Sequence, residues 1–108
     1  MSDDNQIDIP QSFIALFLPP GRHKPNASRE LIALRYELCE DLANMLTETA
    51  RDMFHGLGLS EDAVLQRCHQ GLAGEGAVVS AAESVWVVRR LAELLEWGQP
   101  ELGEAGQS

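Results

Sequence analysis

The sequence predicts an all-α protein, a small helical bundle of three main helices preceded by a short N-terminal helix. Residues 28–55 repeat apolar side chains at steps of three and four, without an interior glycine or proline. Two further apolar segments each follow a serine, Ser60 or Ser80, at a position suited to capping a helix. Prolines and glycines separate the segments. Together these observations favour helices joined by turns.

The length of 108 residues suits a single domain with one core. We place this helical domain at residues 9–98. Residues 1–8 are polar and acidic, so we expect a disordered acidic tail there, and we expect a second disordered tail at 99–108.

The short N-terminal helix is expected from Pro10 to Leu18. Pro10 suits the first turn of a helix and follows Asp8, a possible cap. The run is short enough to be a buried extended segment instead. Pro19, Pro20 and Gly21 end it in either case.

The central helix should begin at a cap formed by Asn26 or Ser28 and end at Gly56 in the left-handed conformation. One apolar row along it is expected to face the core: Leu31, Leu34, Leu38, Leu42, Met45 and Met53. A second row widens the apolar face beyond the needs of one neighbour, which predicts a homodimer. We assign self-association to this row and to one tryptophan of the last helix: Ile32, Cys39, Leu46, Met53 and Trp86.

The two later helices carry clear start signals. Ser60 should cap a helix that runs to about Gln70, and the glycine-rich stretch 71–76 should be a turn. Ser80 and Glu83 have the spacing of a capping box before a helix over 81–97. In that last helix we expect an ion pair between Arg89 and Glu93, with Gly98 and Pro100 ending it.

The net charge of −9 makes a nucleic acid an unlikely partner, because its phosphates would be repelled. Residues 22–35 nevertheless hold four bases and one acid. The N-terminus has no basic and apolar leader, and no run approaches the roughly 20 apolar residues of a membrane span. Two cysteines in such a chain suit a reducing compartment, so we expect a cytoplasmic protein without membrane contact.

No motif in the sequence predicts catalysis, a metal or a cofactor. Lys24 is the only lysine, so a phosphate-binding loop of the ATPase type is missing. Cys68 and His69 would project about 100° apart on a helix, and no cysteine or histidine pair has metal-ligand spacing. Both cysteines lie on apolar helix faces that should raise the thiol pKa. The acids Glu37, Glu40, Asp41 and Glu48 fit the solvated face of the long helix.

Three runs of this sequence resemble a group of small proteobacterial proteins that often carry the label "ATPase with chaperone activity". The runs are residues 12–17, 35–42 and 89–95. The similarity covers nearly the whole chain and implies an association with chaperone or protease machinery. Because the phosphate-binding loop is missing here, the resemblance transfers neither ATPase activity nor functional residues.

We therefore predict a non-enzymatic protein-interaction module, an adaptor or regulator. The expected contact residues lie in the basic segment and on the adjoining helix face: Arg22, Lys24, Arg29, Arg35, Tyr36 and Glu40. The alternative is a nucleic-acid-binding regulator with a helix-turn-helix-like segment at 57–97 that uses Arg67. Glu61 and Asp62 disfavour this alternative, because they stand at the helix end that would face the DNA groove.

Overall fold

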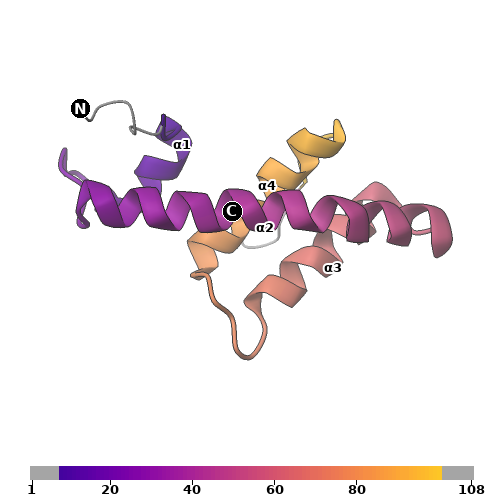
Figure 1. Cartoon of the computed structure of the whole chain (residues 1–108). Coiled ribbons are helices and arrows are strands. Elements are labelled where there is room, and N and C mark those ends of the chain that lie inside the picture. Colours follow the sequence, from indigo (N-terminus) through magenta and orange to yellow (C-terminus); the bar gives the residue numbers. More distant parts are fainter. Residues whose placement is uncertain (1–7, 101–108) are drawn as a thin grey trace, which may run out of the picture. The chain divides into compact units, whose positions relative to one another are not determined.

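The computed structural model describes residues 8–100, and within that range it contains helices and no strands. The elements are α1 (Gln11–Ile14), the 3₁₀ helix η2 (Ala15–Phe17), α2 (Arg29–Gly56), α3 (Glu61–Ala73) and α4 (Ala81–Leu95), as Figure 1 shows. This confirms the all-α prediction, with three main helices and a short one before them. Of the tails expected at 1–8 and 99–108, residues 1–7 and 101–108 lie outside the described residues.

The chain groups into two compact units, Met1–Leu38 and Cys39–Ser108, which we call the first and second units. Helix α2 runs through both of them. The single domain over residues 9–98 stays a prediction.

The N-terminal helical segment in the first unit is shorter than expected. Pro10 is the N-cap residue in an extended conformation, and its carbonyl accepts the N–H groups of Phe13 and Ile14 at 2.9 and 3.1 Å. The expected cap by Asp8 is wrong, since no side chain caps α1. After four residues the helix tightens into η2, which ends at Phe17. Pro19 and Pro20 follow at once, and proline cannot continue a helix.

Helix α2 starts at a serine cap. The Ser28 Oγ accepts the N–H of Leu31 at 3.1 Å, which decides between the two expected caps in favour of Ser28. The other end differs from the prediction. Gly56 still belongs to the helix, and Gly58 is the residue with a positive φ of 70°. The helix continues because the Leu57 N–H still bonds to the Met53 carbonyl at 3.1 Å.

The most deeply buried side of α2 is not the row that we predicted to face the core. Ile32 and Cys39, from the second row, are buried, as are Ala43 and Ala50 on the same side of the helix. Three members of the supposed core row are largely exposed: Leu31 by 46%, Leu34 by 63% and Met45 by 67%. The prediction is therefore wrong for these three residues, which face water.

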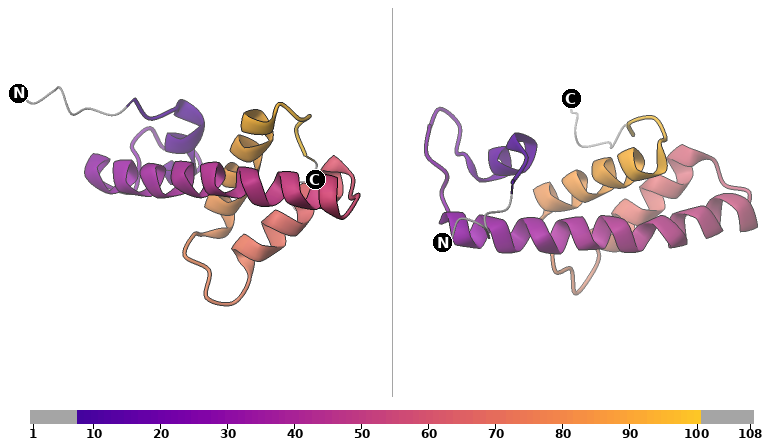
Figure 2. Two further views of the ribbon diagram at one scale, coloured as in Figure 1. Left: turned by 45° about the vertical axis from the view of Figure 1, so that its right-hand side comes forward. Right: turned by 45° about the horizontal axis from the view of Figure 1, so that its top comes forward.

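In the second unit, α3 and α4 pack against the part of α2 that follows residue 38, as both views in Figure 2 show. One continuous cluster of buried residues joins them: Ala50, Val64, Leu65, Cys68, Val88, Leu91 and Ala92. Trp97 closes one end of this core, where its ring lies 5.2 Å from that of Phe54 between centroids. Small residues such as Ala50 and Ala92 let the helix backbones approach closely.

Both predicted caps of the later helices are confirmed. The Ser60 Oγ accepts the Ala63 N–H at 3.1 Å. The Ser80 Oγ accepts the Glu83 N–H at 3.0 Å, and the Glu83 Oε1 accepts the Ser80 N–H at 2.8 Å, which completes the capping box. Helix α3 reaches Ala73, so Gly71 is helical and the predicted turn begins later than we expected.

Helix α4 ends two residues before the predicted Trp97, and a non-glycine residue ends it. Glu96 adopts the left-handed conformation, with φ 61° and ψ 35°. Its N–H bonds to the Glu93 carbonyl at 3.0 Å, and the Trp97 N–H bonds to the Ala92 carbonyl at 2.9 Å. These two bonds form a Schellman motif, which glycine usually completes because it has no Cβ to strain.

We expect Glu96→Gly to stabilise the protein by about 1 kcal/mol, because it relieves the left-handed strain. The control is Glu48→Gly at an exposed, helical position of α2, where the same exchange should destabilise by roughly 0.5 kcal/mol. Urea unfolding followed by circular dichroism measures both changes. A loss of stability in Glu96→Gly would contradict the assigned helix end.

Candidate protein-binding surface

An aromatic contact joins α1 and η2 to the start of α2 within the first unit. The buried ring of Phe13 lies 5.6 Å from Phe17 and 5.6 Å from Tyr36 between centroids, with Tyr36 in an edge-to-face arrangement. Such pairs add to the burial of the rings themselves. Tyr36, which we predicted as a partner contact, is half-buried and packs inside the first unit.

The loop between η2 and α2 presents the basic residues Arg22 and Lys24 to solvent. Its turn is closed by the Arg22 N–H on the Pro19 carbonyl at 3.0 Å, with Gly21 at a φ of 76°. The Asn26 N–H then bonds to the Phe17 carbonyl at 2.7 Å. These bonds hold the loop back against η2 and place both cations on the surface of the first unit.

A cavity of about 250 Å³ lies beneath the end of this loop. It is lined by five apolar residues and one cation: Ile9, Ile14, Pro25, Ala27, Ile32 and Arg29. Arg29 is exposed and belongs to the first turn of α2. Of the predicted contact residues, Arg22, Lys24 and Arg29 are thus exposed, and Arg35 is half-buried on α2.

A second feature of the first unit is the pair Leu31 and Leu34. Both side chains are large, apolar and exposed, and positions three apart share one side of a helix. Ile32 projects about 100° away from Leu31 and is buried. The exposed leucines therefore occupy a different side of α2 from the residue that lines the cavity.

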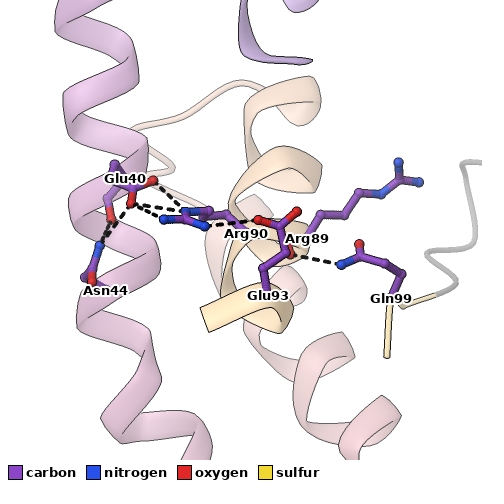
Figure 3. Close-up of polar contacts among 6 residues, drawn as sticks. All are labelled: Glu40, Asn44, Arg89, Arg90, Glu93 and Gln99. Atoms are coloured by element: carbon purple, nitrogen blue, oxygen red, sulfur yellow. Dashed lines mark hydrogen bonds and ion pairs between the residues drawn. The ribbon is translucent and has the colours of Figure 1, made fainter. Parts of the chain in front are cut away.

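Glu40, the last of the predicted partner contacts, belongs to an ion pair within the second unit. Figure 3 shows the Arg90 guanidinium turned toward Glu40, with Arg90 Nε 2.9 Å from Oε1 and Nη2 2.9 Å from Oε2. Arg90 Nη1 also pairs with Glu93 at 3.0 Å. The hydrogen bond to Glu40 raises the pKa of Arg90 further above its already high ordinary value. The pair thus links α2 to α4 and engages the Glu40 carboxylate.

The expected i,i+4 ion pair between Arg89 and Glu93 is replaced by the Arg90 contacts. Helix geometry explains the change, because Arg90 projects toward α2 while the Arg89 side chain points away from it (Figure 3). The Arg89 carbonyl accepts the Gln99 side-chain amide at 3.4 Å.

The residues predicted for self-association lie mainly inside the units. Ile32, Cys39 and Trp86 are buried, and Leu46 and Met53 are half-buried against the core of the second unit. We predicted a homodimer because this second apolar row widens the apolar face of α2 beyond the needs of one neighbour. The row is instead buried or half-buried within the chain, so it is not the apolar side that α2 presents to solvent.

Cys39 and Cys68 are both buried and form no disulfide. Burial raises the pKa of the Cys68 thiol, which agrees with the prediction for that residue. Among residues 8–100, no three histidine, cysteine, aspartate or glutamate side chains gather as a metal site requires. Within the same range, no helix is long and apolar enough to cross a bilayer.

Arg67, the residue of the nucleic-acid hypothesis, lines an open groove of about 730 Å³ in the second unit. Gln66, Gln70, Gly71, Ala63 and Met53 complete its lining. Guanidinium and amide groups can read base edges. However, α4 is the second helix of the proposed motif, and it buries seven of its residues, while its exposed charged residues are Arg89 and Glu93.

Comparisons with protein-family models, curated proteins and solved structures found no match. The candidate surface is therefore defined by geometry alone. Sequence reasoning missed Leu31 and Leu34 because it assigned them to the core. The sequence did contain a pattern that indicates the buried side of α2. Ala43 and Ala50 are seven residues apart and lie on the same side of the helix as Ile32 and Cys39.

We expect Arg90→Met to destabilise the protein by about 1 to 2 kcal/mol, because it removes charge-assisted bonds to Glu40 in a half-buried setting. The matched control is Arg89→Met, which changes an exposed neighbour of the same type and should cost less than about 0.5 kcal/mol. Urea denaturation of both variants compares them. Equal losses of unfolding free energy in the two variants would show that the ion pair between Arg90 and Glu40 does not stabilise the fold.

The raised pKa of Cys68 predicts a loss of stability in alkaline solution. In the unfolded chain the thiol ionises above roughly pH 8.5, while the folded thiol stays neutral to higher pH. The unfolded state then binds fewer protons, so the free energy of unfolding falls as pH rises. Between pH 7.5 and 10, wild type should lose more stability than Cys68→Ala in urea titrations. Parallel losses would refute the assignment.

Proposed function

We propose that this protein is a non-enzymatic protein-interaction module, an adaptor or regulator, whose N-terminal half of α2 docks onto a partner protein. The observation that supports the proposal is the exposure of Leu31 and Leu34 side by side on that helix. An apolar helix face is a common docking element, read through side chains three and four residues apart. The resemblance to the chaperone-labelled group suggests that the partner belongs to chaperone or protease machinery.

Charge supports a protein partner at the first unit. The described residues 8–38 carry four bases and three acids, whereas residues 39–100 carry four bases and ten acids. Basic side chains beside an apolar strip can steer a partner whose surface is acidic at its rim and apolar at its centre. The overall charge of −9 limits non-specific binding to nucleic acid.

A second copy of the chain is one candidate for this partner. A homodimer of this kind would use Leu31 and Leu34 in place of the predicted Ile32 and Cys39, which the chain buries itself. Light scattering over a dilution series distinguishes it from a different protein, because only self-association makes the solution mass depend on concentration.

The nucleic-acid-binding alternative is favoured by Arg67 alone, in its groove with two glutamines. It requires that duplex DNA bind with an affinity that falls steeply with salt and that depends on Arg67. The acids Glu61 and Asp62 in the first turn of α3 oppose it.

The test of the proposal compares wild type with Leu34→Glu in affinity capture from extracts of the source organism. Leu57→Glu is the matched control, because Leu57 is 65% exposed and lies in the second unit, against 63% for Leu34. We expect a defined set of proteins, or a second copy of the chain, to be lost with Leu34→Glu and retained with Leu57→Glu. A charge at Leu34 should leave stability within about 0.5 kcal/mol of wild type, because that position is exposed.

The proposal fails if capture by Leu34→Glu equals capture by wild type. It also fails if both variants lose the same proteins, because the added negative charge, and not a docking site at Leu34, would then explain the loss. Quantitative mass spectrometry of the three captured sets gives the result directly.

A further inference from the structure

The cavity beneath the loop of the first unit has the size of a side-chain pocket. Its volume of about 250 Å³ is smaller than the roughly 300 to 1,000 Å³ of sites that enclose a drug-sized ligand or a cofactor. Five of its six lining residues are apolar, which favours an aliphatic or aromatic side chain as its content. The sixth, Arg29, provides the single charged group.

The described segments that line the cavity carry three cations. Arg29 lines the cavity, and Lys24 directly precedes the lining residue Pro25. Arg22 lies three residues before Pro25 in the same exposed loop. The first turn of the 28-residue helix α2 opens at Arg29, so the helix macrodipole adds positive potential there.

Among the described residues, two acids lie close to these positions in the sequence. Asp8 is exposed and directly precedes the lining residue Ile9. Glu30 is two residues from Ile32 on α2, so its side chain projects about 160° away from the cavity side. Among the described residues of these segments, the cations Arg22, Lys24 and Arg29 thus outnumber the one acid, Asp8, that does not project to the opposite side of α2.

We propose that this cavity binds an acidic peptide segment of a partner protein through one bulky apolar side chain flanked by carboxylates. The apolar side chain would fill the space between Ile9, Ile14 and Ile32. A flanking carboxylate pairs with the Arg29 guanidinium, whose five N–H donors can hold a carboxylate and keep a further contact. A second carboxylate lies near Lys24.

This inference is independent of the leucine pair in the proposed function. The cavity lies on the side of α2 that carries Ile32, whereas Leu31 and Leu34 occupy another side. A peptide in the cavity therefore adds a second contact with its own residues. Each contact can fail without the other, because capture through Leu34 and peptide binding at Arg29 are measured in separate experiments.

The experiment measures fluorescence anisotropy with the full chain and three labelled hexapeptides. The probe is Asp-Glu-Leu-Phe-Glu-Asp. One control peptide, Lys-Arg-Leu-Phe-Arg-Lys, keeps the apolar pair and reverses the charge. The other, Asp-Glu-Ala-Ala-Glu-Asp, keeps the charge and removes the apolar pair. Wild type should bind the probe at least tenfold more tightly than it binds either control.

Protein variants test the two parts of the pocket. Ala27→Phe fills the cavity and Arg29→Glu reverses the charge of its rim, and each should weaken probe binding at least tenfold. Arg51→Glu changes an exposed cation of the second unit and should leave binding within twofold. Circular dichroism checks each fold. If Ala27→Phe does not fold, the exposed Arg29 still supplies the test.

Three results would overturn the proposal. The first is that wild type binds no probe at micromolar to millimolar concentration. The second is that Ala27→Phe and Arg29→Glu bind it as wild type does, which would make the contact diffuse. The third is that decanoate binds at the cavity and displaces the probe with higher affinity, which would assign the site to a fatty acid.

Discussion

The burial of one side of α2 is the constraint on which the remaining structure depends. Ala43 and Ala50 have no side chain beyond Cβ, so a neighbouring helix can approach the backbone closely at those positions. In the second unit the buried side of α2 meets Val64 and Leu65 of α3 and Leu91 of α4 in one cluster. Once this side faces inward, helix geometry turns Leu31, Leu34 and Met45 outward.

Features that depend on neighbours in the sequence were the most predictable. The capping box of Ser80 and Glu83 and the cap of Ser60 each join residues three apart, so the pattern contains all of their partners. The ends of helices were less predictable. Whether the left-handed residue is Gly56 or Gly58, or a glutamate such as Glu96, depends on where the last helical bond forms. Packing beyond the helix decides that position.

The candidate site was only partly predictable for the same reason. Arg22 and Lys24, which we predicted as contact residues, are exposed, because a segment rich in proline and glycine between two helices lies on the surface. The choice between two apolar rows of one helix is a tertiary question, and both rows have helical spacing. Glu40 and Arg90 are fifty residues apart, so no local pattern predicts that they pair.

The net charge differs in sign between the described parts of the two units. Residues 39–100 carry an excess of six acids, whereas residues 8–38 carry an excess of one base. In the proposed interaction, an acidic partner would be repelled by the average field of the second unit and would meet favourable charges at Arg22, Lys24 and Arg29. Charge of this kind mainly governs approach and orientation, while apolar burial governs how long a complex lasts. If the first unit binds such a partner as proposed, the loop cations would govern its approach and the exposed apolar groups would govern the lifetime of the complex.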